Sequence, residues 1–191
     1  MYSPNVIYHV YNQSNQHQYL FHEETHYTYF IKKLRRELLP HAEILCYCLM
    51  PTHFHIQLIP KASGLEIEPY QQNQQILHTV FRSLLSSFTK SINRASGGRG
   101  SLFRAKTQYK PAYTDFVPEN WEMEEEKPFT HYLPYIKYCF RYIHNNPNKA
   151  GLVERPEQWL YSSAPDYAGL RDLGICNYAL AERLLGIRRM G

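Results

Sequence analysis

The sequence predicts an α+β fold, namely a ferredoxin-like βαββαβ antiparallel sheet with an added C-terminal tyrosine-bearing helix. The main observation is the order of the periodic segments, which runs strand, helix, strand, strand, helix, strand along the chain. The second is composition, because 191 residues with 43% hydrophobic residues suit one globular domain with a substantial core. We therefore expect residues 1–191 to form a single domain, with an acidic insertion at about 115–128 and a C-terminal extension at about 154–191.

The first half of the chain is expected to form a strand, a helix and a hairpin. Residues 5–11 are rich in β-branched and aromatic side chains, which is typical of a strand. A helix is predicted over 23–39, because acidic residues stand near its start and a proline follows its end. Residues 42–50 and 53–59 are two further strands, and the Pro-Thr pair at 51–52 makes the turn between them.

The second half begins with an expected loop over 60–73 and adds two helices and one strand. A helix over 74–93 is predicted from apolar residues at a spacing of four, namely Ile76, Val80, Leu84 and Phe88. A fourth strand is expected over 102–113, and a third helix over 130–145. Pro147 disfavours helical geometry at the residue before it, so this last helix is predicted to stop near that point.

Two histidines in the third strand, His53 and His55, are the most informative chemical feature. Strand side chains alternate between faces, so both imidazoles point the same way, while Phe54, Ile56 and Leu58 point into a core. Two neutral nitrogen donors on one face can hold a divalent metal at an open site. The alternative interpretation is a pair of ordinary strand histidines without a ligand.

The third helix carries two separate stripes of side chains. Its aliphatic side, which we expect to contact the core, consists of Leu133, Ile136, Phe140 and Ile143. On another side lie Tyr135, Tyr138, Tyr142 and Asn146, with Asn146 one turn after Tyr142. A tyrosine can act as a nucleophile, and a nearby amide oxygen could be a third metal ligand. The alternative is a half-buried aromatic face with a structural role only.

The charge distribution predicts a nucleic-acid partner more clearly than the net charge of +4 does. Residues 69–114 contain no Asp or Glu, which is typical of a surface that binds a phosphate backbone, although a solvated basic face remains the alternative. An acidic run follows and is expected to be a solvated loop or, less readily, a phosphate mimic. The basic residues that we expect to bind DNA are Arg82, Lys90, Arg94, Arg99, Arg104 and Lys106.

Cysteine spacing and hydropathy bear on the compartment. The four cysteines form no Cys-x-x-Cys pair, which favours reduced, buried thiols over a disulfide framework or a zinc ribbon. The first residues show no basic and then apolar signal pattern, and no run of 18 apolar residues occurs. We therefore expect a cytoplasmic, nucleoid-associated protein with no membrane partner.

Five segments together resemble the single-tyrosine (HUH) transposases of the IS200/IS605 type, and more closely their REP-associated tyrosine transposase branch. The segment 50–56 (MPTHFHI) resembles the His-hydrophobic-His motif of that family. Segment 141–153 (RYIHNNPNKAGLV) is similar to its catalytic-tyrosine segment. The other similar segments are 8–10, 100–103 and 156–163, so the resemblance covers nearly the whole chain in the family's order.

The resemblance implies a ferredoxin-like nuclease core that acts on single-stranded DNA, often beside a hairpin, with a Mg²⁺ or Mn²⁺ ion and a 5′-phosphotyrosine intermediate. It implies that His53 and His55 are metal ligands, that Tyr142 is the nucleophile, and that Asn146 is the third ligand. The chain departs from the family where Thr52 replaces the usual Asn or Asp, and in the acidic insertion.

The expected function is thus a metal-dependent single-stranded DNA endonuclease and strand transferase, with single-stranded or hairpin DNA as partner, working as a monomer or homodimer. Two alternatives share the fold: a non-cleaving module that binds structured nucleic acid, and a metal hydrolase that uses water. A free tyrosine needs activation near neutral pH, for which the candidates are His9, Arg104 and Lys106. We expect His144 to lie at the surface or to contact a phosphate.

Overall fold

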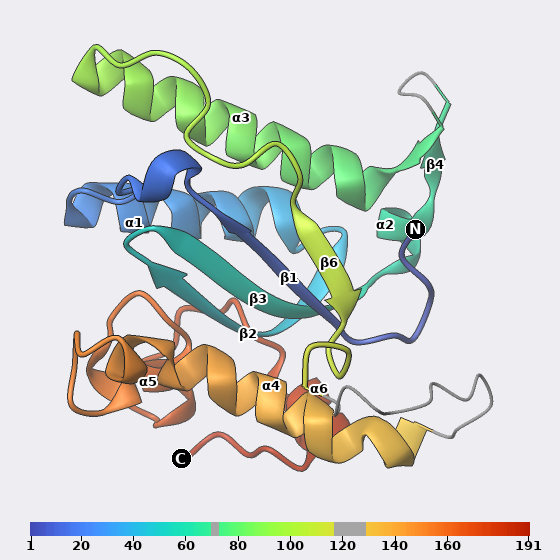
Figure 1. Ribbon diagram of the computed structural model, residues 1–191. Coiled ribbons are helices and arrows are strands. Elements are labelled where there is room, and N and C mark those ends of the chain that lie inside the picture. The colour runs from blue at the N-terminus through green and yellow to red at the C-terminus, as the bar shows by residue number, and fades with distance from the viewer. Residues whose placement is uncertain (70–72, 117–128) are drawn as a thin grey trace.

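A four-stranded antiparallel sheet lies between two layers of helices (Figure 1). The computed structural model describes residues 1–69, 73–116 and 129–191. The sheet has the order β2-β3-β1-β6, so the predicted α+β architecture and the central position of the first and third strands are confirmed. The strands are β1 (Tyr8–Gln13), β2 (Ala42–Met50), β3 (His53–Pro60) and β6 (Gln108–Pro111).

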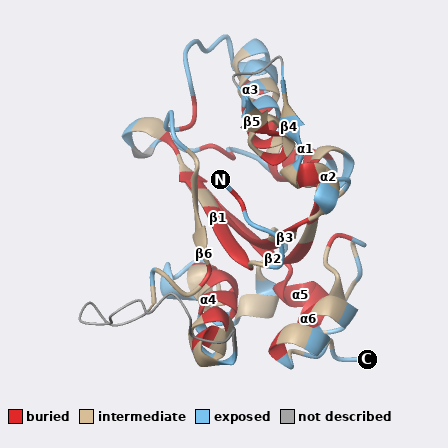
Figure 2. Cartoon of the chain, turned by 90° about the vertical axis from the view of Figure 1, so that its right-hand side faces the viewer, coloured by how far each residue is buried: buried red, intermediate tan, exposed pale blue. Residues whose placement is uncertain are grey.

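The two faces of this sheet are covered by different helices, as Figures 1 and 2 show. One face packs against α1 (Glu24–Lys33), which continues into a π-helical turn over Leu34–Leu38, and against α3 (Ile76–Ser96). The opposite face packs against α4 (Phe129–Lys149) and α6 (Tyr178–Leu185), with the short α5 (Ala164–Tyr167) beside them. Short 3₁₀ turns occur at Asn15–His17 and Pro156–Gln158.

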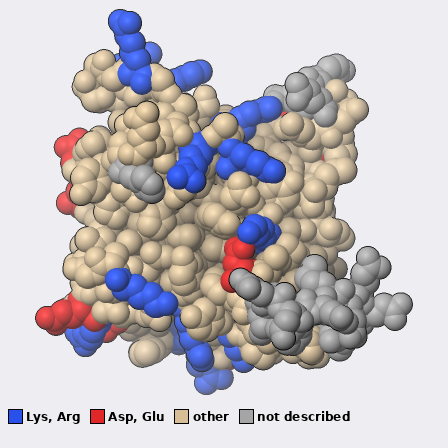
Figure 3. All heavy atoms as spheres, in the orientation of Figure 1, with Lys and Arg blue, Asp and Glu red and all other residues tan. Residues whose placement is uncertain are grey.

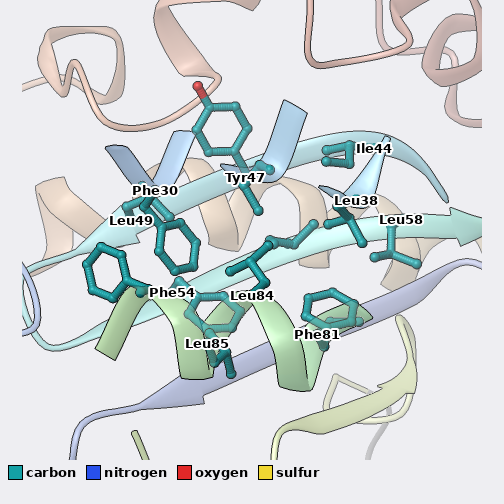
Figure 4. Close-up of a cluster of buried hydrophobic side chains, with 14 of the residues drawn as sticks. Phe30, Leu38, Ile44, Tyr47, Leu49, Phe54, Leu58, Phe81, Leu84 and Leu85 are labelled. Atoms are coloured by element: carbon teal, nitrogen blue, oxygen red, sulfur yellow. The ribbon is translucent and has the colours of Figure 1, made fainter. Parts of the chain in front are cut away.

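The larger core lies between the sheet and the pair α1 and α3 (Figure 4). Phe54, Ile56 and Leu58 of β3 point into it and are fully buried, as the period of two predicts. Burial of each such side chain stabilises the fold by about 1.5–3 kcal/mol. The buried stripe of α3 differs from the expected one, because Ile76 and Val80 are only half-buried. The buried residues of α3 are Leu77, Phe81, Leu84, Leu85, Phe88 and Ile92.

A second core lies under the other face, where α4 meets β2. The predicted aliphatic stripe of α4 contributes Ile136, Phe140 and Ile143, all buried. β2 carries a bulge between Ile44 and Cys46, and there two consecutive residues, Leu45 and Cys46, both face this second core. All four cysteines are free thiols, as expected.

The C-terminal extension completes the sheet by covering the outer edge of β2. The Leu49 amide donates to the carbonyl of Tyr161 at 2.9 Å, and the Ser163 amide donates to that of Tyr47 at 2.9 Å. The Asn177 amide donates to the carbonyl of Ile44 at 2.8 Å. An uncovered edge strand would leave its backbone groups unpaired and open to association with another chain. Every residue of β2 except its second is accordingly buried.

The fourth strand is shorter than predicted because it is interrupted. Phe103 forms a bridge with Ser14, and regular pairing with β1 resumes only at Gln108. Between these points, the side-chain amide of Asn12 donates to the carbonyl of Arg104 at 3.1 Å and to Oγ1 of Thr107 at 3.0 Å. The interruption turns residues 104–106 outward, where all three are exposed.

Three further boundaries differ from the sequence prediction. The first strand begins at Tyr8 because Asn5 has a positive φ of 61°, which breaks an extended chain. It then runs to Gln13, two residues past its expected end at residue 11. The expected loop 60–73 contains α2 (Ala62–Leu65) and β4 (Ile67–Glu68), while 70–72 lie outside the described residues. β4 pairs with β5 (Gln74–Gln75), so the helix predicted from residue 74 begins at Ile76.

The last long helix does not stop at Pro147. α4 continues to Lys149, so Asn146 is helical and remains one turn after Tyr142. The fixed φ of proline is compatible with a helix, and its cost is a lost hydrogen bond and a clash with the carbonyl of Ile143, about 3 kcal/mol. Ile143 and Pro147 are both buried, and their packing offsets this cost.

Most of the predicted acidic insertion, 117–128, lies outside the described residues. Asp115 and Phe116 at its start form part of a turn after β6. Within the described ranges, no helix combines the length and the apolar character needed to cross a bilayer.

Candidate active site

Histidines from two central strands and the tyrosine of α4 meet on the sheet face that α4 covers. His9 of β1 and His55 of β3 have their Nε2 and Nδ1 atoms 2.9 Å apart. The ring of Tyr142 stands edge-on to His55, with centroids 5.5 Å apart and planes at 78°. His53 lies two residues from His55 on the same face, with ring centroids 5.0 Å apart. Residues far apart in the sequence are thus brought to one place.

His53 is held between its chain neighbour and α4. Its Nδ1 lies 3.1 Å from Oγ1 of Thr52, and its ring is hydrogen-bonded to the side chain of Asn146. Burial lowers the pKa of His53, and the hydrogen bond with Asn146 opposes that shift. The Thr52 hydroxyl and the Asn146 side chain thus both act on the His53 ring.

His55 is almost completely buried, with 6% of its surface exposed. Burial lowers its pKa well below the ordinary value, and the neighbouring His9 and His53 add to the effect. Its Nδ1 atom contacts His9, whereas its Nε2 atom has no hydrogen-bond partner within the described chain. A buried ring nitrogen without a partner is uncommon and is suited to a ligand.

Tyr142 is half-buried among aromatic rings and one cation. Phe116 and His9 lie 5.3 Å and 6.3 Å from it between ring centroids. The Nζ atom of Lys149, two helical turns further along α4, lies 5.5 Å from the centre of the Tyr142 ring. A cation at this distance from an aromatic ring makes a cation–π contact.

The donor set of this site is two imidazole nitrogens and one amide oxygen, from His53, His55 and Asn146. In the part of the chain that the structure describes, no group of three or more His, Cys, Asp or Glu side chains gathers as a metal site. A metal ion here would thus depend on the Asn146 amide as its third ligand. The partnerless Nε2 of His55 fits such an ion, and a mixed nitrogen and oxygen set suits Mn²⁺.

Two residues near the site were not predicted. Lys149 lies seven residues after Tyr142, a spacing that would have placed it on the same face, but the helix was expected to end before it. Asp115 belongs to the run that was expected to be a solvated loop. Its Oδ2 atom lies 3.7 Å from Nδ1 of His9, and its Oδ1 atom lies 2.6 Å from Nζ of Lys110.

A groove of about 840 Å³ runs along α3 and the segment 100–109. Four of the six predicted DNA-binding residues line it: Arg82, Lys90, Arg104 and Lys106. The rings of Tyr2, His78 and Tyr109 also line it, with centroids 4.6–4.7 Å apart. Arg94 and Arg99 are exposed at and beyond the last turn of α3 rather than in the groove. Figure 3 shows Lys and Arg side chains gathered over α3 and beside β6.

Three expectations about neighbouring residues were different in the structure. Arg104 and Lys106, considered as activators of Tyr142, line the groove beside α3 instead. His144 is buried rather than at the surface, because the C-terminal extension covers it. Its Nε2 lies 2.7 Å from Oγ of Ser163, and burial lowers its pKa to about 3.

Comparisons with known proteins support the fold. No protein-family model matches the chain, and no curated protein matches it. Among solved structures, the fold is similar to that of a REP-associated tyrosine transposase bound to a REP hairpin, with a TM-score of 0.53 and 17% sequence identity. The likeness covers 90% of this chain and 86% of the other chain. At this identity it establishes a shared transposase-like α+β fold.

Proposed function

We propose that this protein is a metal-dependent single-stranded DNA endonuclease and strand transferase that uses Tyr142 as its nucleophile. The observation that carries the proposal is the convergence of Tyr142 with His53, His55 and Asn146 on one sheet face. The fold of the matched transposase and the hairpin bound to that protein support DNA, near a hairpin, as the substrate class.

In the proposed reaction, the Tyr142 oxygen attacks the phosphorus of a phosphodiester in line with the leaving group. The bond from phosphorus to O3′ breaks, so the product strand leaves with a free 3′-OH after taking up a proton. The 5′ end stays on the enzyme as a phosphotyrosine, which conserves the bond energy. Attack by a second 3′-OH then reverses the step and joins strands without ATP.

His53, His55 and Asn146 would hold a Mg²⁺ or Mn²⁺ ion that polarises the phosphoryl group and stabilises its developing charge. His53 and His55 suit this task because their lowered pKa values keep both rings neutral near pH 7. Lys149 stands over the Tyr142 ring, where it makes a cation–π contact and adds positive charge beside the proposed nucleophile. His9 reaches Tyr142 only as an edge-on ring and contacts His55 more directly.

The groove along α3 is the proposed path of the DNA backbone. Arg82 and Lys90, about two turns apart on α3, line this groove together with Arg104 and Lys106 of the segment that follows the helix. Cations along such a groove bind phosphates regardless of sequence, and exposed rings can stack on unpaired bases. The interruption of the fourth strand, which turns 104–106 outward, builds this surface.

The test is incubation with end-labelled single-stranded DNA that contains a hairpin, with Mn²⁺ present, followed by denaturing gel analysis. The wild-type chain should yield a protein–DNA adduct that survives SDS, and chelation should prevent it. Tyr142→Phe should bind the same DNA and form no adduct. Tyr138→Phe is the matched control, since Tyr138 lies on the same helix and is 53% exposed.

The two alternatives give different results in the same assay. A non-cleaving binding module would retain the DNA in both variants and in the wild type without any product. A metal hydrolase that uses water would cut the DNA without an adduct, and Tyr142→Phe would cut equally well. Either result would overturn the proposed role of Tyr142.

A further inference from the structure

We propose that Asp115 and His9 form a positioning relay that fixes the His55 imidazole with its proton on Nδ1 and keeps Nε2 free to bind a metal ion. The relay rests on the metal site of the proposed function, but it concerns His55 before any DNA is cut. Neither residue is a metal ligand or a nucleophile in this account, and both act through His55.

The contact between His9 and His55 allows two arrangements of the proton. Nε2 of His9 and Nδ1 of His55 lie 2.9 Å apart, so one of them must donate to the other. If His55 donates, its Nε2 carries a lone pair and can bind a metal. If His9 donates, neutral His55 carries its proton on Nε2 and cannot. The pair alone does not choose between these arrangements.

Asp115 makes the choice through the other side of the His9 ring. Its Oδ2 atom lies 3.7 Å from Nδ1 of His9, long for a hydrogen bond but close enough for a strong electrostatic preference. A carboxylate at this position attracts an N–H on Nδ1 and repels a lone pair there. The neutral His9 ring that results has an acceptor at Nε2, so His55 must donate to it.

Asp115 is suited to this role because it stays ionised. The contact with His9 and then the ion pair with Lys110, at 2.6 Å, lower the pKa of its carboxyl to about 2. The carboxylate is also held in place by Lys110, which is itself the β6 residue paired with His9 of β1. The first residue of the acidic run thus has a specific position against the site.

Burial holds the two histidines of the relay rigidly. His9 and His55 expose 3% and 6% of their surfaces, and their rings are stacked at 25° with centroids 5.0 Å apart. Tyr11 packs against both rings, at 4.8 Å from His9 and 5.8 Å from His55 between centroids. Thr52 makes a corresponding contact with Nδ1 of His53, so both histidines contact a neighbour through Nδ1. In metal sites, residues that contact the ligands in this way set the orientation and the tautomer of the ligand rings.

The first measurement is the tautomer of His55 in the metal-free protein at neutral pH, by long-range ¹H–¹⁵N correlation NMR of the ring nitrogens. His55 signals are assigned by their loss in His55→Asn. The wild type should show a protonated Nδ1 and an unprotonated Nε2 on His55. Asp115→Asn should give a mixture of both tautomers, whereas Glu182→Gln should not. Glu182 is the matched control, as an acid paired with a basic side chain, Arg188, away from the site.

The second measurement is Mn²⁺ affinity by titration calorimetry, without DNA. Substitution of a residue that hydrogen-bonds to a metal ligand weakens metal binding about 10–100-fold. The Mn²⁺ affinity of His9→Phe should be lower than that of the wild type by a factor in this range. The affinity of Asp115→Asn should also be lower, by a smaller factor. His9→Gln should restore most of the affinity, because its amide oxygen can accept from Nδ1 of His55. A fold defect in His9→Phe is detected by thermal unfolding, and Asp115→Asn, at an exposed position, then carries the test.

Two results would overturn the relay. One is a wild-type His55 with its proton on Nε2, or a His9 with protons on both nitrogens. The other is Mn²⁺ affinity in Asp115→Asn and His9→Phe equal to that of the wild type. A protein that binds Mn²⁺ with the expected tautomer but cuts no DNA would sustain the relay and contradict the proposed function, so the two failures are distinguishable.

Discussion

The two faces of β3, a strand of eight residues, carry side chains with different roles. On the face toward α1 and α3, Phe54, Ile56 and Leu58 are fully buried in an apolar core. On the face toward α4, His53 and His55 lie among other polar groups instead. The three apolar side chains are fully buried, whereas His53 is only half-buried and the buried Nε2 of His55 has no hydrogen-bond partner among the described residues. Burial is thus used for stability on one face and to hold chemical groups on the other.

This comparison explains why the histidines can be so deeply buried. An unpaired buried polar group costs about 1–3 kcal/mol. The opposite face, with its aromatic cluster of Phe30, Phe54 and Phe88, supplies stability that offsets such a cost. Substitutions on the two faces should therefore affect different measurable quantities.

The largest expected effect is on activity, from the polar face. His55→Ala should reduce DNA cleavage by roughly a thousandfold, since it removes a metal ligand and the charge stabilisation that depends on it. Its free energy of unfolding should change by only about 1–2 kcal/mol, because the lost group was itself incompletely satisfied. Cleavage rates and urea unfolding of the same preparation check both parts. A cleavage rate within tenfold of that of the wild type would contradict the proposed role of the polar face in activity.

The next largest effect is on stability, from a substitution on the apolar face. Phe54→Ala should lower the free energy of unfolding by about 3–5 kcal/mol through loss of burial and a cavity. At a temperature where the variant is still folded by circular dichroism, its cleavage rate should remain within several-fold of the wild type. A collapse of activity in the folded variant would show that the two faces are not independent.

A smaller effect is on the pH dependence of stability, and it comes from His144, a buried residue of α4. Its folded pKa, about 3, is lower than the ordinary value of 6.5, so the unfolded chain binds a proton more readily. The stability from neutral His144 is present above pH 6.5 and is lost as pH falls toward 3. His144→Phe should flatten the decrease of unfolding free energy with acidity in this window, measured by urea unfolding at several pH values. An unchanged slope would contradict a buried, neutral His144.

The smallest expected effect is on DNA binding at the groove. The salt dependence of single-stranded DNA binding is the slope of the logarithm of the binding constant against the logarithm of the salt concentration. Arg104→Ala with Lys106→Ala should reduce the size of this slope by about 1.4, because each lost phosphate contact removes about 0.7. Fluorescence anisotropy over a range of salt concentrations measures this slope. Lys32→Ala with Arg183→Ala, two exposed positions outside the groove, is the control. Equal slopes in both double variants would remove the groove from the DNA path.

Local patterns predicted the features that depend on neighbouring residues. The common face of His53 and His55 follows from the period of a strand, and the core stripe of α4 follows from the period of a helix. The strand order follows from the sequence of elements, because few topologies accommodate that order. The joint role of these residues as a metal site stays a prediction that the experiments above test.

Long-range packing explains what the patterns missed. The break in the fourth strand depends on the Asn12 side chain, which is distant in sequence. Burial of His144 depends on Ser163, and the continuation of α4 through Pro147 depends on packing around it. Because the helix was predicted to end early, Lys149 was not associated with Tyr142. Apart from the seven-residue spacing between Tyr142 and Lys149, these contacts have no signal in local periodicity.

The most direct test of the central claim is to identify the amino acid that carries DNA in the covalent adduct. Protease and nuclease digestion of the trapped adduct, followed by tandem mass spectrometry, locates the nucleotide remnant on one side chain. The account predicts a 5′-phosphodeoxynucleotide on Tyr142 and on no other tyrosine of α4. A remnant on Tyr135 or Tyr138, or cleavage without any modified tyrosine, would contradict it.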